Sequence, residues 1–585
     1  MRRVRGPARR ELVAVAAVFV ACALGLTLLH ARSGRHYRLT AASAIAAARS
    51  YRGDREFLAK NATNGVRVIP LAGELQNVTF FDGPRVVLEA AVGPRGEVRS
   101  TQEHLAGAPL AGAAVANSPW MLALLSALFL LATMVVPLRR LRNLDALVLA
   151  SLTATVVLLN EGLVGASVAC ASLGLAYLMI RCLVVGLRAC DSPTPASSPL
   201  LSHLCAGWEP HRRVRLLRAL VLATTLAFAM ITLTSGGYTD VASASLEGAT
   251  ELLHGVLPYG HIQLAPHGDT YPLLNYVLYV PGALWRPVTT AFSDLSGSLT
   301  VALLASLLTG AALYRIGGGA QIAPGSGEPR EERRLRLTLA WFAFAPALLD
   351  ASCGANNVLV AACLAWMLAL RTRAGASLLA LAMAVWVKLA PLVLVAIWIP
   401  YSRRELVRSS TAAAALSLAL TGLLVALGGP GAVAAMVNSM SFQFERSSFF
   451  APWYTFGVQW LQPLVQAGVL ALVASAALRL RADSSIRGDL VRLGALAAAL
   501  LLGVQLSANY WVWSYLPWVF PLLAVALFAP SSAWVPALAI GTGSPTSAGQ
   551  APGPPAASSA GATATRPRPR LRGRRRSPSG AAAGR

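Results

Sequence analysis

Residues 374–400 read AGASLLALAMAVWVKLAPLVLVAIWIP, and Lys388 is the only charged residue among them. A helix needs roughly 20 apolar residues to cross the hydrocarbon core of a bilayer, so this stretch is long enough to lie in a membrane. It is flanked by RTR at 371–373 and by YSRR at 401–404. Basic flanks favour the cytoplasmic side. We therefore expect the stretch to enter the membrane and return, with its turn at Lys388–Pro391.

The composition extends this interpretation to the whole chain. Of its 585 residues, 55% are hydrophobic and only 13% are charged, about half of the roughly 25% charged residues of soluble domains. These values exclude an ordinary soluble enzyme, a disordered protein and a fibrous protein. About fourteen spans of roughly 20 residues would use near half of the chain. The expected fold is an all-α polytopic membrane protein of about fourteen spans.

The charged residues and the cysteines suggest neither a nucleic-acid site nor a zinc or redox motif. The chain has 50 basic and 25 acidic residues, and Lys60 and Lys388 are its only lysines. Heavy Arg usage accompanies heavy Ala and Gly usage, so it is no evidence for a nucleic-acid partner, and none is expected. The seven cysteines form no CxxC pair, so neither a zinc motif nor a redox motif is predicted.

The distribution of basic residues predicts the topology and the domains. Residues 1–30 are a basic start and a first span, so the N-terminus is expected in the cytoplasm and the protein in the plasma membrane. The C-terminal tail is also expected in the cytoplasm, beside anionic lipid. The expected domains are an extracytoplasmic α+β domain at 31–118, three accessory spans and a cytoplasmic loop at 119–213, a membrane core at 214–540, and a disordered basic tail at 541–585.

Within the core, a gap in positive charge marks an outer loop. No Lys or Arg occurs from Ala219 to Trp285, whereas the Arg-rich stretch 317–336 is expected to be a flexible cytoplasmic loop. The segment 272–290 then cannot cross the membrane completely. We interpret it as re-entrant or interfacial, because three prolines interrupt it. These are Pro272, Pro281 and Pro287.

The segment 31–118 predicts a small α+β domain. LTAASAIAAARS (39–50) is a helix pattern with Thr40 as its N-cap. VRVIPL (66–71), NVTFF (77–81) and RVVLEAAV (85–92) are strand-like, and FDGPR makes a hairpin turn between the last two. The arrangement weakly resembles small PepSY-type domains. We expect a structural or regulatory role for it and no chemistry.

The outer loop carries the first candidate catalytic residues. On a helix over 239–254, five polar residues fall within an arc of about 80°, and four apolar residues face the other way. An acidic face toward a cavity supplies a general base, for which Asp240 at the mouth of a span is the main candidate. The alternative is a surface amphipathic helix with solvated acids. The polar residues are Asp240, Ser243, Glu247, Glu251 and His254, and the apolar ones are Leu246, Ala249, Leu252 and Leu253.

Downstream, His261, His267 and Asp269 add imidazole and carboxylate groups. Together with the nearby acids they suit a divalent cation, although their spacing matches no standard zinc pattern. The other interpretation is a carboxylate that abstracts a proton, with flanking groups that orient a hydroxyl. The sequence predicts no definite cofactor, and a bound divalent cation stays the alternative to the proton-abstracting carboxylate.

Over residues 214–530 the sequence resembles the GT-C membrane glycosyltransferases, and most closely the polyprenyl-phosphate-mannose-dependent mannosyltransferase family (glycosyltransferase family 87). The resemblance rests on an Asp just past a span, on GVLPY (255–259), on a YP-containing re-entrant segment, on LLDASCGANNVLVAACLAW (348–366) and on the Lys-x-x-Pro turn. The chain departs from the pattern in having no DxD motif and in Asn356–Asn357, where many relatives have Gln/Asn–Asp. The four spans and the domain before residue 214 are additional.

The resemblance implies an inverting transferase. A polyprenyl-phosphate donor of a mannose-like sugar or a pentose would enter from the bilayer, and the acceptor would be an extracytoplasmic glycan or lipid. An outer-face Asp would act as the base, which points to Asp240, with Glu251 and Asp269 as further catalytic candidates. The other expected partners are the membrane lipids.

Lys388 is the main candidate for binding the donor phosphate. A Lys at the centre of a single span would cost about 2.5–3.5 kcal/mol, and the apex of a hairpin avoids most of this cost. Fourteen helical residues rise about 21 Å, which brings the ammonium near outer headgroup depth. A snorkelling Lys is the alternative. Arg446, in SFQFERSSFFAPWY (441–454), can grip a phosphate bidentately or anchor an interface.

The remaining candidates would bind substrate. Tyr510 lies in NYWVWSYLPW (509–518), which is an aromatic belt or a surface that stacks on a sugar or a prenyl chain. The competing functions are a transporter or lipid flippase and a GT-C-like scaffold without activity. The substrate-binding candidates are His254, His267, Tyr271, Asn356, Asn357 and Tyr510.

Overall fold

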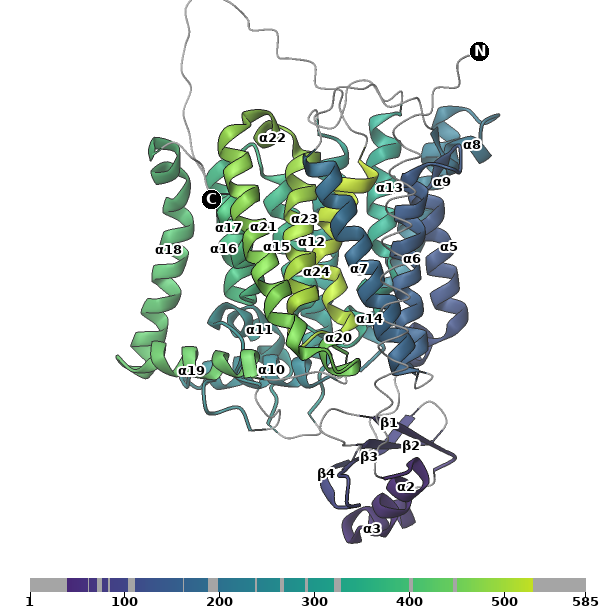
Figure 1. Cartoon of the computed structure of the whole chain (residues 1–585), viewed down its shortest axis with the longest axis vertical. Coiled ribbons are helices and arrows are strands. Elements are labelled where there is room, and N and C mark those ends of the chain that lie inside the picture. The colour runs from purple at the N-terminus through teal and green to yellow at the C-terminus, as the bar shows by residue number, and fades with distance from the viewer. Residues whose placement is uncertain are drawn as a thin grey trace, which may run out of the picture. The chain divides into compact units, whose positions relative to one another are not determined.

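The structure is a computed structural model of the chain (Figure 1). The predicted first span, the basic tail, His267 and Arg446 lie outside the residues that it describes. The described residues are 39–60, 63–70, 76–82, 85–103, 111–160, 163–187, 198–236, 239–263, 268–289, 293–319, 328–398, 403–445 and 450–529.

The N-terminal segment forms the predicted α+β domain. Thr40 caps the first helix through its side chain, which accepts a hydrogen bond from the Ser43 amide. One face of the antiparallel sheet packs on this helix through Ala44, Ala48 and Phe80, all fully buried. A second helix and a fourth strand were not predicted. The elements are α2 (Ala41–Ser50), α3 (Arg52–Lys60), β1 (Gly65–Pro70), β2 (Gln76–Asp82), β3 (Arg85–Val92) and β4 (Val98–Glu103), with the strand order β1-β2-β3-β4.

The rest of the described chain is a bundle of apolar helices, as expected for a polytopic membrane protein. Seven helices in this part are long and apolar enough to cross a membrane, or eight if a pair bent by 52° counts as one span. The long helices are α6 (Leu141–Asn160), α7 (Val164–Leu187), α9 (Pro210–Leu233), α12 (Ser296–Gly317), α18 (Arg403–Gly428), α21 (Gln462–Ala482, preceded by η3 at Gln459–Leu461) and α23 (Leu490–Ser507); the bent pair is α13 (Arg330–Phe342) and α14 (Ala345–Ser352).

Shorter elements complete the bundle. The apolar ones are α5 (Pro119–Thr133), α11 (Leu273–Trp285), α15 (Asn357–Ala369), α16 (Ala374–Val387), η2 (Ala390–Leu394), α17 (Val395–Trp398), η4 (Trp513–Tyr515), α24 (Leu516–Leu523) and η5 (Ala524–Phe528). The connecting ones are α4 (Ala111–Asn117), β5 (Val135–Val136), β6 (Ser198–Pro199), α8 (Leu200–Leu204), α10 (Asp240–Leu253), α19 (Ala432–Glu445), α20 (Pro452–Thr455) and α22 (Ser484–Gly488).

The two ends of the bundle differ in the elements they carry. The helices α10, α19 and α20 lie at one end, which we call the α10 end, and α8 and α22 lie at the other, the α22 end (Figure 1). At the α10 end, α19 is tied to the loop before α11, because Gln443 Nε2 donates to Thr270 Oγ1 over 2.5 Å. With 13 residues, α11 is shorter than the roughly 20 that a crossing needs. Pro281 lies inside α11 and does not interrupt it, contrary to the sequence interpretation.

The stretch 317–336 was predicted to be a flexible loop, and this is wrong for its last part. The helix α13 begins at Arg330, and Arg336 is only 2% exposed. The guanidinium of Arg336 pairs with both oxygens of Glu328, at 2.8 and 3.0 Å, and donates to the Ala132 carbonyl. A charged run becomes part of a buried helix here because carboxylates compensate its charges.

Replacing Glu328 with Gln is expected to lower the free energy of unfolding by about 3–5 kcal/mol, because Arg336 would stay buried without its counter-charge. The matched control is Glu331→Gln. Its partner Arg218 has a side chain that is 61% exposed, so that change should cost less than about 1 kcal/mol. Chemical denaturation in detergent measures both. Equal losses in the two variants would contradict the prediction.

The effect of Glu328 also has a pH dependence. Burial alone raises the pKa of its carboxyl, but the positive charges of Arg336, Arg142 and Arg333 lower it more, so the pKa lies below its ordinary value. A depressed folded-state pKa contributes stability above the unfolded pKa of about 4.3. That contribution is lost as the pH falls through the folded pKa, so the deficit of Glu328→Gln should shrink in acid.

Within the stretch 374–400, the described residues 374–398 double back on themselves, as the predicted hairpin requires. The helix α16 ends at Val387, because Pro391 has no amide hydrogen to give to the Val387 carbonyl and its ring would clash there. Lys388 takes an extended conformation (φ −149°, ψ 141°). The chain then returns, since Trp398 Nε1 donates to Ser377 Oγ, near the start of α16, over 2.7 Å. Lys388 therefore lies at a break in the helical backbone.

Candidate functional site

Lys388 points into the bundle and is only 8% exposed. Its Nζ donates to Asn357 Oδ1 over 2.5 Å. The amide nitrogen of Asn357 donates to Asp350 Oδ1 over 2.7 Å, and Asp350 is fully buried. A polar chain therefore runs from the break after α16, through the first residue of α15, to a carboxylate on α14.

Three aromatic rings surround the same ammonium. Its nitrogen lies 5.3 Å from the ring centre of Tyr271, 4.9 Å from that of Tyr515 and 5.0 Å from that of Trp518. Rings within about 6 Å attract a cation through their negative faces. Trp518 Nε1 also donates to Asn357 Oδ1 over 2.7 Å. The ammonium is thus enclosed by rings and an amide, and Asn357 connects it to a carboxylate. We call Lys388, Asn357, Tyr271, Tyr515 and Trp518 the lysine cage.

A tight turn between α14 and α15 positions Asn357 and Asp350. Gly354 has φ +71°, and a Cβ there would lie 2.2 Å from Ser298 Oγ, so only glycine fits. The amide of Val358 donates to Asp350 Oδ2 over 3.1 Å. Asp350 therefore satisfies an amide in the first turn of α15, which fixes the helix start that carries Asn357.

Asn356 belongs to a separate hydrogen-bonded row. Its amide nitrogen donates to Asn275 Oδ1 over 2.8 Å, and Asn275 in turn donates to Ser245 Oγ over 3.1 Å. These bonds join the turn to α11 and α10. The side-chain oxygen of Asn356 is buried and has no hydrogen-bond partner among the described residues. The two adjacent asparagines therefore face different neighbours, and only Asn357 reaches Lys388.

The predicted acidic arc on α10 is only partly solvent-facing. Asp240 is exposed at the first position of the helix, but Glu247 is 5% exposed and accepts the Gln263 amide over 2.7 Å. All residues from Ala244 to Thr250 are buried. The interpretation as a surface helix is therefore wrong. The helix is buried because it packs on α11, where Gly248 leaves room for the Tyr276 ring.

The other candidates on α10 lie nearer its C-terminal end. Glu251 is half-buried and His254 is exposed. Leu253, expected on the apolar side, is 41% exposed. Among the described residues, no hydrogen bond or ion pair joins Glu251 or His254 to the lysine cage, so the structure does not bring these two candidates to Lys388.

Asp269 lies two residues before Tyr271 and is held by two donors. Its Oδ2 accepts the Gly260 amide over 2.9 Å and Ser439 Oγ over 2.7 Å. Burial, and then the charge of Asp269, raise the pKa of Tyr259 above its ordinary value. Asp269 therefore joins the loop after α10, the loop before α11 and helix α19. Within the part of the chain that is described, no three His, Cys, Asp or Glu side chains form a group that could hold a metal ion.

The cage contains two residues that the sequence interpretation did not single out. Tyr515 and Trp518 stack on each other at 4.3 Å between ring centres. The predicted Tyr510 is not a member of the cage, and its ring centre lies 6.4 Å from that of Tyr515. The cluster NYWVWSYLPW was the available signal, and the spacing of three between Tyr515 and Trp518 puts both on one helix face.

In comparisons with protein-family models, with curated protein sequences and with solved structures, the chain has no match.

Proposed function

We propose that the chain is an integral-membrane glycosyltransferase that moves a mannose-like sugar or a pentose from a polyprenyl phosphate to an extracytoplasmic acceptor. The observation that carries the proposal is the lysine cage. A cation at a helix break, lined by aromatic rings and an amide, suits a phosphate that is attached to a sugar and a prenyl chain. Next to it, Leu389 is 40% and Leu392 is 54% exposed, so an apolar chain can run along the hairpin apex.

In this proposal the α10 end faces the outside. The α22 end carries the arginines at the start of α9 and α13, which the positive-inside rule assigns to the cytoplasm. With about fourteen spans, both termini lie in the cytoplasm. The donor phosphate binds Lys388, and the acceptor approaches from the α10 end. Asp240 takes the proton from the acceptor hydroxyl as its oxygen attacks the anomeric carbon, while the bond from that carbon to the phosphate oxygen breaks and polyprenyl phosphate leaves. Inversion follows from this single displacement.

One observation favours a transporter or lipid flippase as the second candidate function. Asp350 and Lys388 are buried, beside the turn that ends α14 and at the break after α16. Ionisable groups at discontinuous helices are typical of transporter binding sites.

One assay separates the candidates. Purified protein in liposomes is offered a panel of radiolabelled polyprenyl-phosphate sugars together with extracts of envelope glycans and lipids. Transfer of label to an acceptor is expected for one donor of the panel. Movement of a labelled lipid between leaflets without transfer would instead support the flippase. Donor binding with neither activity would support the inactive scaffold.

A further inference from the structure

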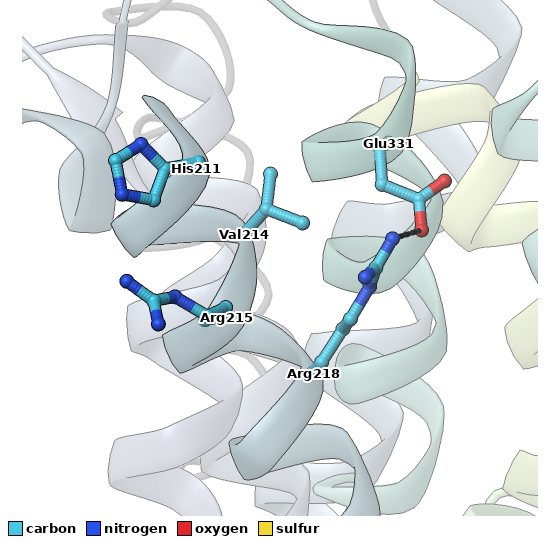
Figure 2. Close-up of a pocket in the computed structure, with 5 residues that line it drawn as sticks. All are labelled: His211, Val214, Arg215, Arg218 and Glu331. Carbon is cyan, nitrogen blue, oxygen red and sulfur yellow. Dashed lines mark hydrogen bonds and ion pairs between the residues drawn. The ribbon is translucent and has the colours of Figure 1, made fainter. Parts of the chain in front are cut away.

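A hollow of about 690 Å³ lies at the α22 end, between the first turns of α9 and the start of α13. Its lining residues are His211, Val214, Arg215, Arg218 and Glu331. Figure 2 shows Arg218 reaching across to Glu331, while His211, Val214 and Arg215 project from the neighbouring turns of α9. The volume is within the range of about 300–1,000 Å³ that is usual for ligand sites.

The hollow carries excess positive charge. Arg218 donates to Glu331 over 3.0 Å, but Glu331 is shared with Arg334 at 3.5 Å and with the Tyr314 hydroxyl. Arg215 and His211 form no ion pair or side-chain hydrogen bond with the described residues. One carboxylate therefore faces several cationic groups, and the complementary ligand is an anion. Fork-like guanidinium groups fit a phosphate ester best.

The same face of α9 continues as an apolar stripe. At 100° per residue, four exposed apolar side chains lie within about 60° of Arg215. From Arg215 to Leu233 the helix rises about 27 Å, which approaches the roughly 30 Å of a bilayer core. These side chains are Leu222 (60% exposed), Leu226 (56%), Met230 (65%) and Leu233 (46%).

We infer that α9 is a specific binding site for an anionic phospholipid. The phosphate ester lies in the hollow against Arg215 and His211, with Arg218 held in place by Glu331. The acyl chains lie along the apolar stripe. A free phosphate would use the hollow alone, so the stripe assigns the ligand to a lipid. The site lies at the opposite end of the bundle from the lysine cage and does not depend on the proposed function.

Native mass spectrometry of the purified full chain, titrated with phosphatidylglycerol or phosphatidylcholine, tests the inference. Preferential binding of phosphatidylglycerol is expected. Arg215→Ala should weaken that binding about fivefold, since a basic group near anionic lipid is worth about 1 kcal/mol, and Arg215→Glu should weaken it further. The matched control is Arg212→Ala, which removes an exposed arginine of the same helix turn that does not line the hollow. It should change binding less than twofold.

A second variant tests the role of the stripe. Leu226→Ser should weaken phosphatidylglycerol binding, while glycerol 3-phosphate in large excess should not displace the lipid from the wild type. Equal binding of the two phospholipids, or equal losses in the Arg212 and Arg215 variants, would overturn the inference. Displacement by glycerol 3-phosphate, with no effect of Leu226→Ser, would overturn it in favour of a soluble phosphate ester. All variants change exposed residues, and thermal unfolding checks that they fold.

Discussion

Lys388→Ala is expected to weaken binding of the polyprenyl-phosphate donor roughly 10- to 100-fold, because a hydrogen bond between charged groups contributes about 1.5–3 kcal/mol. Titration of a labelled donor into the purified protein measures the affinity. Lys388→Arg should recover part of it, since the positive charge persists although its geometry changes.

The structure also offers a purely structural role for Lys388, and the experiment must exclude it. Asn357 connects the ammonium to the buried carboxylate of Asp350, so Lys388→Ala leaves a buried negative charge without compensation. Such a loss costs about 3–5 kcal/mol, and a destabilised protein would bind the donor poorly for that reason alone.

A double variant separates the two roles. Lys388→Met together with Asp350→Asn removes both charges and keeps the side-chain volumes, which is often neutral for stability. An asparagine offers one acceptor oxygen, whereas Asp350 accepts from both Asn357 and Val358. We therefore expect this variant to be more stable than Lys388→Ala but less stable than the wild type, and still to bind the donor 10- to 100-fold more weakly. Wild-type donor affinity in the double variant would show that Lys388 has only a structural role, and the proposed donor site would be wrong.

The features that could be predicted from the sequence depend on local causes. The turn at Lys388 follows from Pro391 and from the basic flanks of 374–400, and both are readable in the chain. The cap at Thr40 follows from one side chain and one amide. The pairing of Asn357 with Lys388 was anticipated only in part, since the resemblance pointed to both residues but not to a bond between them.

The features that could not be predicted depend on distant partners. The helical start of α13 needs Glu332 to pair with Arg213 of α9, 119 positions earlier. The burial of α10 depends on the fit of Gly248 against Tyr276, and no periodicity of α10 reveals that α11 covers it. The aromatic members of the cage come from segments separated by more than two hundred positions, so an aromatic belt and a cage look the same in the sequence.

Asp240→Asn is expected to lower turnover by about 10²–10⁴-fold, or about 3–5 kcal/mol in the barrier, with donor binding nearly intact. The carboxylate is exposed at the first position of α10, and the one hydrogen bond it accepts from a described residue comes from the adjacent Val241 amide. It is therefore accessible to an acceptor hydroxyl. Thr239 ties this helix start to the Cys353 carbonyl in the turn after Asp350, so Asp240 and the cage are carried by adjoining elements. Single-turnover assays with saturating donor measure the chemical step.

Asp269→Asn is the informative comparison, because Asp269 is the other candidate base at this end. Its carboxylate already accepts two hydrogen bonds, from Gly260 and Ser439, so it holds two loops and helix α19 together. We expect Asp269→Asn to loosen the loop before Tyr271, and so to weaken donor binding and stability more than the chemical step. Asp269 would instead be the general base if Asp240→Asn turned over normally while Asp269→Asn bound the donor but did not turn over. Normal activity and normal donor binding in both variants would remove the catalytic role from Asp240 and from Asp269.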